Sequence, residues 1–326
     1  MIVRRRLGRT DLQIAPLVLG GGVFGANGMD QERSFAVLDA FVASGGTMID
    51  TADIYAAYLP GHQGGESESM IGDWLQHRGR RDDVQIVTKV GGPNGDTPGS
   101  LRADHIERSI DNSLRRLRTD YVDVYLAHVD DLSTPQEETA QAFDRIVRSG
   151  KIRHIGASNF SPDRLRSSIS LQKAAGLAHY SVFQPPYNLL QRDFEHTHRA
   201  YCDYEDIGVI TYFALAQGYL TGKYRVHQDL AKSVRGSDMA AFGGQVRNYM
   251  TSDGPAVLEV LDDISAARGT TLAAIALAWI MRKPGVAAPI ASATRVEQLE
   301  QILPAMALNL TDQEVSRLDA TTEQEP

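Results

Sequence analysis

The chain has 326 residues, of which 42% are hydrophobic and 23% are charged, and its formal net charge is −8 at pH 7. This is the size and composition of a globular enzyme with one large domain or two ordinary ones, and the negative charge argues against a nucleic-acid-binding surface and against attraction to anionic membranes. The single cysteine, Cys202, excludes an intramolecular disulfide and a cysteine-rich metal site, so we expect a reducing, cytoplasmic location and no bound metal.

The N-terminal segment has two interpretations. Three arginines at residues 4–6 precede an apolar stretch at 17–24, an order that resembles an export signal. However, the charged turn at 8–11 and Pro16 would interrupt a signal helix. We therefore predict a β-hairpin over residues 3–14, followed by the first core strand. No later apolar run reaches the roughly 20 residues of a membrane helix, so no membrane segment is expected.

Beyond the hairpin, short apolar segments alternate with segments of helical periodicity. Strands are predicted at 17–20, 48–49, 84–90, 121–127, 152–155, 181–183, 209–212 and 286–290. Helices are predicted at 31–43, 67–77, 102–117, 135–148, after 161–162, and at 190–206, 255–268, 271–282, 297–303 and 314–318. A polar, glycine-rich loop is predicted from 222 to 254, and Thr311 with Glu314 forms a capping box for the last helix.

Eight strand–helix units without a linker predict a single (β/α)8 barrel domain over residues 1–326, with an N-terminal hairpin and extra C-terminal helices. The alternative is an open, doubly wound sheet, which usually carries a glycine-rich turn after its first strand. Gly20, Gly22 and Gly25 match that turn formally, but no helix is predicted before about Gln31, so the match is weak.

Four polar residues follow the ends of neighbouring predicted strands. Asp50 and Tyr55 follow the second strand, Lys89 ends the third and His128 follows the fourth. Singly, each has a structural explanation, such as a turn cap or a satisfied core histidine. Together they make an acid catalyst, because an ammonium lowers the pKa of a phenol, a carboxylate holds the ammonium, and a neutral imidazole donates a hydrogen bond. Such a set suits protonation of a carbonyl oxygen while hydride reaches the carbon.

The chain also resembles the aldo-keto reductase family along nearly its whole length. The matching motifs are Leu7-Gly8-Arg9-Thr10, Asp50-Thr51-Ala52-Asp53-x-Tyr55, Gly65-Glu66-Ser67-Glu68, Thr88-Lys89, Tyr121-Val122-Asp123 through His128, the segment 150–159, Gln184-Pro185-x-Tyr187-Asn188 and Leu220-Thr221-Gly222-Lys223. Eight motifs in the family's order are a specific signal. The resemblance implies a (β/α)8 barrel, a nicotinamide cofactor bound without a Rossmann fold, and a tetrad of Asp50, Tyr55, Lys89 and His128 in which Tyr55 is the proton donor.

The resemblance also implies a site for NADPH. The nicotinamide carboxamide would be held by Ser158, Asn159 and Gln184, and Tyr212 would stack on the ring. The pyrophosphate would lie along Ala214, Leu215, Gln217 and Gly218, near Lys223. The adenosine end would be bound by Ser292, Thr294 and Arg295 at the 2′-phosphate and by Gln298 and Gln301 at the adenine. Two positions depart from the family pattern: Phe213-Ala214 replaces Ser-Pro, and Ile302 replaces a frequent Asn.

The sequence therefore predicts NADPH-dependent reduction of an aldehyde or ketone. Two alternatives stay open: an alcohol or sugar dehydrogenase that works in the oxidative direction, and a non-enzymatic barrel that senses the nucleotide. The substrate mouth is predicted to include Phe24, Tyr58, His62, Val129, Asp130 and Asp131. These aromatic and polar groups favour a sugar or another polar carbonyl as the small-molecule partner. The sequence leaves open whether the chain forms a homo-oligomer and whether the loop at 222–254 closes over the cofactor.

Overall fold

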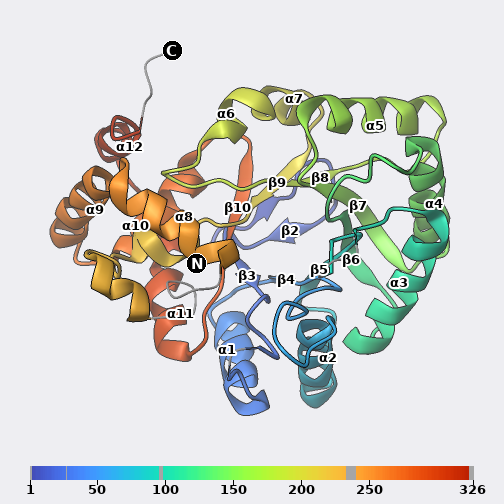
Figure 1. Ribbon diagram of the computed structural model, residues 1–326, viewed down its shortest axis with the longest axis horizontal. Helices are drawn as coiled ribbons and strands as arrows, with labels where there is room; N and C mark the ends of the chain where they lie inside the picture. Colours follow the sequence, from blue (N-terminus) through green and yellow to red (C-terminus); the bar gives the residue numbers. More distant parts are fainter. Residues whose placement is uncertain (1, 27, 95–97, 233–239, 323–326) are drawn as a thin grey trace.

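The computed structural model describes residues 2–26, 28–94, 98–232 and 240–322 (Figure 1). Within them, eight parallel strands form a closed barrel in the order β10-β3-β4-β5-β6-β7-β8-β9. The strands are β3 Val18–Gly20, β4 Met48–Asp50, β5 Gln85–Val90, β6 Val122–Ala127, β7 Ile152–Ser158, β8 Val182–Gln184, β9 Gly208–Thr211 and β10 Val286–Ala291. The pairing of Ile290 with Val18 closes the ring. The predicted (β/α)8 barrel is confirmed, and the open sheet is excluded.

Helices surround the strands (Figure 1). They are α1 Gln31–Ala43, α2 Glu66–Arg78, α3 Ala103–Leu117, α4 Gln136–Arg148, α5 Pro162–Ala174, α9 Gly254–Arg268, α10 Leu272–Arg282, α11 Val296–Ile302 and α12 Asp312–Asp319. The capping box is present: Glu314 N donates to Thr311 Oγ1 at 3.3 Å, and Thr311 N donates to Glu314 Oε2 at 2.7 Å. The last helix consequently begins at Asp312, two residues before its predicted start.

The N-terminal hairpin closes one end of the barrel. Its strands are β1 Arg5–Arg6 and β2 Gln13–Ile14, paired antiparallel. The hairpin residues Leu7, Leu12 and Ile14 pack with the inward-facing apolar side chains of the barrel, and all three are buried. The hairpin interpretation is therefore confirmed. Burial of its apolar side chains against the inner layer holds the hairpin across the end of the barrel, before β3 begins.

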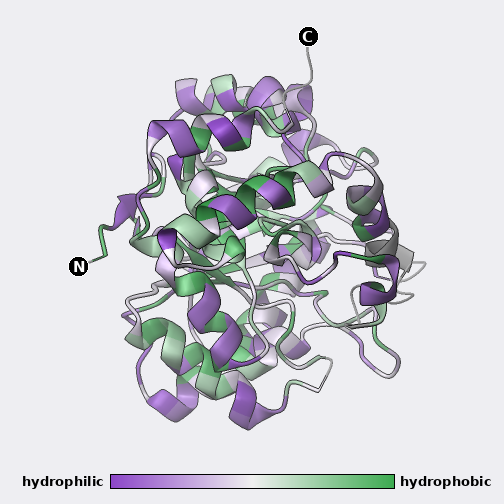
Figure 2. Ribbon diagram, turned by 90° about the vertical axis from the view of Figure 1, so that its left-hand side faces the viewer, coloured by the Kyte–Doolittle hydropathy of each residue, from purple (hydrophilic) through white to green (hydrophobic). Residues whose placement is uncertain are grey.

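Apolar residues form one layer inside the barrel and a second layer between the strands and the helices. On β6, Val124 and Leu126 belong to the inner layer, whereas Tyr125 and Ala127 belong to the outer layer. This is the two-residue period of a strand. Figure 2 shows the complementary pattern on the helices, whose outer faces are mostly hydrophilic.

One predicted helix and one predicted loop are wrong. Residues 190–206 form two short helices, α6 Asp193–Thr197 and α7 Arg199–Tyr204. They are separated at His198, whose ring stacks on Phe183 with centroids 4.7 Å apart and whose Nε2 lies 2.9 Å from Phe160 O. At His198 the backbone φ is −110°, away from the helical value of about −63°, and these tertiary contacts fix the residue at the junction.

The predicted loop at 222–254 contains the 3-10 helix η2 His227–Lys232 and the helix α8 Ala240–Thr251. Val246 in α8 is fully buried, and Tyr249 packs on Tyr219 with ring centroids 5.9 Å apart. Apolar residues at 246, 249 and 250 have helical spacing. The glycines at 243 and 244 lower the local helix propensity, so this segment was predicted as a loop. The part of this predicted loop at 233–239 lies outside the described residues.

Within the described ranges, no single helix is long and apolar enough to cross a membrane, and the one pair that would qualify together, α9 and α10, is bent by 100°.

Candidate active site

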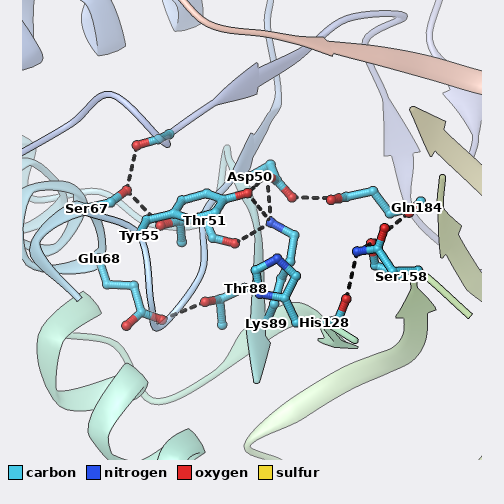
Figure 3. Close-up of polar contacts among 12 residues, drawn as sticks. Asp50, Thr51, Tyr55, Ser67, Glu68, Thr88, Lys89, His128, Ser158 and Gln184 are labelled. Carbon is cyan, nitrogen blue, oxygen red and sulfur yellow. Dashed lines mark hydrogen bonds and ion pairs between the residues drawn. The ribbon is translucent and has the colours of Figure 1, made fainter. Parts of the chain in front are cut away.

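The barrel strands place the predicted catalytic residues on one rim. The inward-facing positions are Met48 and Asp50 on β4 and Val87 and Lys89 on β5. They continue with Leu126 on β6 and His128, which directly follows that strand. Because side chains alternate along a strand, each polar residue lies two positions beyond an inner-layer apolar residue and shares its face. Tyr55 joins them from the loop after β4 (Figure 3).

Lys89 is the centre of the contacts between these residues. Its Nζ donates to Asp50 Oδ2, to Thr51 O and to Tyr55 Oη, each at 2.8 Å, and the side chain is fully buried. An ammonium has three donors and no acceptor, so these contacts use all of its hydrogens. The Tyr55 oxygen therefore accepts from Lys89. Its own proton can then go to Asp50 Oδ2, at a long 3.3 Å, or to a substrate oxygen.

The acidity of Tyr55 differs from the prediction. Burial, followed by the Asp50 carboxylate, raises the pKa of Tyr55 well above its usual value. The net shift is therefore opposite to the predicted one, because burial disfavours the phenolate more than the Lys89 ammonium favours it. Tyr55 is thus fully protonated at neutral pH. The Lys89 ammonium lies where negative charge would develop if that proton were transferred, so it can act on the transition state.

His128 is a neutral imidazole. Burial, followed by the charge of Lys89, lowers the pKa of His128 to about 3. The ring meets the Tyr55 ring edge-on, with centroids 6.1 Å apart. A Cβ at Gly92 would lie 2.8 Å from His128 Nδ1, so glycine at position 92 leaves space for the imidazole. Over the physiological pH range His128 can donate one hydrogen bond and carries no charge.

The residues predicted to hold the nicotinamide form a hydrogen-bonded group beside the tetrad. Ser158 Oγ donates to Gln184 O at 2.8 Å, and Asn159 Nδ2 donates to His128 O at 2.9 Å. Tyr212 Oη donates to Asn159 Oδ1 at 2.7 Å. Asn159 has a φ of 56°, a left-handed conformation that Asn tolerates better than most residues. The structure thus brings these four residues together at the ends of β7, β8 and β9.

One contact in this group was not predicted from the sequence. Gln184 Nε2 donates to Asp50 Oδ1 at 2.7 Å (Figure 3). Asp50 is therefore held on one oxygen by Lys89 and on the other by Gln184. Gln184 ends β8, so the strand alternation places it in the barrel, but only the closed ring brings β8 opposite β4.

The segment predicted to line the pyrophosphate is a tight turn after β9. It includes Ala214 and Leu215 and continues into the 3-10 helix η1 Ala216–Thr221, where Gln217 and Gly218 have φ values of 57° and 94°. A Cβ at Gly218 would lie 2.9 Å from Lys223 Nζ, so Lys223 is adjacent, as predicted. Gln217 Nε2 donates to Gln245 of α8. Helix α8 therefore contacts this segment.

The residues predicted for the adenosine end lie around the start of α11. A Cβ at Gly20 would lie 2.5 Å from Ser292 Oγ, which places Ser292 beside the end of β3. Gln298 Oε1 accepts from both Thr294 N and Thr294 Oγ1, at 2.9 and 2.8 Å. Arg295 precedes α11 and its side chain is 64% exposed, with Glu297 Oε2 at 3.9 Å from its Nε.

The two remaining positions at this end differ in burial. Gln301 is exposed, and its backbone oxygen accepts from Thr271 Oγ1 at 2.5 Å. Ile302, the departure from the family pattern, is 4% exposed and belongs to the apolar core. The side chain at position 302 therefore serves packing in this chain.

The predicted substrate-lining residues are only partly brought to the mouth. Tyr58 is 47% exposed and its Oη donates to Gly22 O at 3.3 Å, whereas Phe24 is fully buried. His62 Nδ1 lies 3.4 Å from Pro60 O, and Val129 is half-buried.

The two carboxylates predicted at the mouth have structural partners. Asp130 forms a bidentate ion pair with Arg164 of α5, at 2.7 and 2.9 Å. Asp131 accepts from Leu101 N at 2.9 Å and from Thr134 Oγ1 at 2.6 Å. Both carboxylates thus have partners within the protein that hold the loop after β6, and their place at the substrate mouth stays a prediction.

Among the described residues, no group of three or more His, Cys, Asp or Glu side chains is arranged to hold a metal ion.

Comparison with known proteins gives a consistent result. The model of the family described as "Aldo/keto reductase family" matches residues 16–323. An uncharacterized oxidoreductase, YrpG, of Bacillus subtilis is 33% identical, over 96% of this chain and 93% of that protein. Norsolorinic acid reductase B of Aspergillus parasiticus is 28% identical, over 97% of this chain and 82% of that protein. An aryl-alcohol dehydrogenase [NADP(+)] of Phanerodontia chrysosporium is also 28% identical, over 95% of this chain and 83% of that protein.

Proposed function

The chain belongs to the aldo/keto reductase family of nicotinamide-dependent oxidoreductases, and from that premise we propose that it reduces an aldehyde or ketone with NADPH, with Tyr55 as the proton donor. One observation carries the assignment of Tyr55. Lys89 Nζ lies 2.8 Å from the Tyr55 oxygen and 2.8 Å from the Asp50 carboxylate, inside the barrel and away from water. A half-buried phenol with an ammonium at its oxygen is suited to give up a proton, because the ammonium stabilises the negative charge that develops there.

The chain's own residues would act on the carbonyl oxygen. The nicotinamide, when bound, supplies hydride to the carbonyl carbon. Tyr55 gives its proton to the oxygen, and the carbonyl becomes an alcohol. Lys89 stabilises the phenolate that remains, and Asp50 keeps Lys89 charged. His128, neutral across the working pH range, would donate a hydrogen bond to the same oxygen. A proton from solvent then restores Tyr55.

The donor set beside the tetrad fits a nicotinamide cofactor. Ser158, Asn159 and Gln184 offer hydroxyl and amide groups that match a carboxamide, and Tyr212 offers a flat ring. The Gln184–Asp50 hydrogen bond connects this set directly to the tetrad.

For the substrate, we favour an aromatic carbonyl over the sugar or other polar carbonyl suggested by the sequence. Asp130 and Asp131, two of the polar groups behind that suggestion, already have partners in Arg164 and in the loop. Tyr58 and Tyr212 remain as partly exposed aromatic rings, and flat apolar faces bind flat apolar rings. A relative is an aryl-alcohol dehydrogenase.

The test is NADPH oxidation, followed by absorbance, against a panel of aryl aldehydes, aliphatic ketones and sugars. Turnover with aryl aldehydes would support the proposal. Faster NADP+ reduction with alcohols would favour the dehydrogenase direction. Tight nucleotide binding without turnover of any carbonyl or alcohol would favour the sensor.

Arg295→Ala is expected to weaken NADPH binding and leave NADH binding nearly unchanged. NADP differs from NAD by one phosphate, and a charge-assisted contact is worth roughly 1.5–3 kcal/mol. The dissociation constant for NADPH should therefore rise about ten- to a hundredfold, since 1.4 kcal/mol is a factor of about ten. Fluorescence titration of both nucleotides measures the change.

Arg102→Ala is the matched control for this variant. Arg102 also precedes a helix, is 68% exposed and faces an acidic residue two positions later, Asp104. The Arg102→Ala variant should leave the affinity for both nucleotides unchanged. An equal loss for NADH and NADPH in Arg295→Ala would show that Arg295 supports α11 or the adenine. No loss would place the phosphate elsewhere.

A further inference from the structure

The Asp50 carboxylate is held from two sides of the barrel. Lys89 Nζ donates to Asp50 Oδ2 at 2.8 Å from the neighbouring strand β5, and Gln184 Nε2 donates to Asp50 Oδ1 at 2.7 Å from β8, across the ring (Figure 3). The three residues are at most 2% exposed. A carboxylate with a close donor on each oxygen cannot rotate about its Cβ–Cγ bond without losing one of these hydrogen bonds.

The orientation of the Gln184 amide follows from this partner. An ionised carboxylate only accepts hydrogen bonds, so Nε2 must face Asp50 and Oε1 must point elsewhere. The backbone on either side of this amide is also fixed. Gln184 O accepts from Ser158 Oγ at 2.8 Å, and the next carbonyl, Pro185 O, accepts from Tyr212 N at 3.0 Å. Gln184 therefore presents a donor to Asp50 from a strand end that its neighbours hold in place.

This contact matters for the proton of Tyr55. Lys89 donates to the Tyr55 oxygen at 2.8 Å, so the hydroxyl hydrogen itself must turn to another acceptor, either Asp50 or a substrate oxygen. Asp50 Oδ2 lies 3.3 Å from Tyr55 Oη, outside the usual range of about 2.5–3.0 Å for such a bond. After burial, the Asp50 carboxylate is a cause of the raised pKa of Tyr55. A carboxylate closer to the phenol would therefore hold its proton more firmly.

We propose that Gln184 is a positioning residue that binds Asp50 Oδ1 and thereby keeps the carboxylate at its long distance from the Tyr55 hydroxyl, so that the Tyr55 proton goes to the carbonyl oxygen. This proposal rests on the function proposed above. Without the Gln184 donor, the carboxylate can rotate and bring an oxygen within hydrogen-bond distance of Tyr55. The proton must then leave Asp50 before it is transferred, which slows the chemical step.

Gln184→Met tests the proposal, because methionine has a similar length and lacks the amide. The measurement is single-turnover oxidation of NADPH with saturating NADPH and carbonyl, which separates the chemical step from any loss of cofactor affinity. The rate should fall about ten- to a hundredfold, the scale of one hydrogen bond to a charged group. A wild-type rate under these conditions, or a loss confined to the dissociation constant of NADPH, would overturn the proposal.

Gln172→Met is the matched control. Gln172 of α5 is 1% exposed, and its Oε1 accepts from Tyr180 N at 3.1 Å. Both variants remove a buried amide and should lower the urea midpoint, but only Gln184→Met should slow the single turnover. An equal loss of rate in the control would assign the effect to general loosening of the fold. Gln184→Asn keeps an amide but withdraws it from Asp50 by one methylene, so it should slow the reaction even if Gln184→Met does not fold.

Combination with Asp50→Asn shows whether Gln184 acts through the Asp50 charge. In Asp50→Asn the charge that competes for the Tyr55 proton is absent, so adding Gln184→Met should slow the single turnover much less than it slows wild type. Independent effects would multiply, because mutations at sites that do not interact add in free energy. A double variant whose loss of rate is the product of the two single losses would contradict the positioning role.

Urea unfolding of the same four proteins separates failure of this proposal from failure of the proposed function. Gln184→Met should cost less stability once Asp50 is uncharged, because a hydrogen bond to a charged group is roughly twice as strong as a neutral one. Additive losses of stability would refute the contact itself, whatever the activity. Absence of carbonyl reduction in wild type would refute the function. Reduction by wild type with an unimpaired single turnover in Gln184→Met would refute only the role of Gln184.

Discussion

Replacement of Tyr55 by phenylalanine is expected to abolish most carbonyl reduction while NADPH binding stays nearly unchanged. The variant removes the hydroxyl that supplies the proton and keeps the ring that packs against His128. Proton transfer from a positioned side chain contributes about 10²–10⁴-fold to a rate, and the loss should fall in that range. Single-turnover oxidation of bound NADPH measures it, because this excludes effects on product release.

The matched control for this variant is Tyr204→Phe. Tyr204 lies on α7 and is 83% exposed, so loss of its hydroxyl should alter neither turnover nor binding. NADPH affinity measured on all three proteins establishes that the active-site variant is folded and loaded. Wild-type turnover in Tyr55→Phe would require another proton donor and would remove the central assignment of the proposal.

The rim on which the tetrad lies could be predicted because two local rules determine it. Asp50, Lys89 and His128 each come at the end of an apolar strand, and parallel strands bring their ends to one face. The two-residue period then decides that Lys89 faces the barrel and Thr88 faces the helices. Both rules act over a few residues, so they can be applied to a single sequence.

Contacts between distant segments could not be predicted in this way. The ion pair of Asp130 with Arg164 of α5 is one such contact, because the two residues are 34 positions apart. The high pKa of Tyr55 depends on how completely the folded chain buries the phenol. In each case the decisive quantity is burial or a partner far along the chain.

Lys89→Met is expected to lower both stability and activity. Methionine fills a similar volume but removes the donor that reaches Asp50, Thr51 and Tyr55. Asp50, which is 2% exposed, would keep Gln184 Nε2 at 2.7 Å and lose its counter-charge. Removing one partner of a buried ion pair typically costs about 3–5 kcal/mol, so the free energy of unfolding should fall by that order. Urea denaturation measures it.

A double variant separates the two effects of Lys89. In Asp50→Asn combined with Lys89→Met the uncompensated carboxylate is gone, so most of the lost stability should return. Activity should not return, because the ammonium at the Tyr55 oxygen is still missing and burial continues to oppose the phenolate. The comparison needs urea midpoints and pH–rate profiles for wild type, both single variants and the double variant. If Lys89→Met keeps its activity with an unchanged pH profile, Lys89 only anchors Asp50, and the charge that stabilises the phenolate must come from another residue.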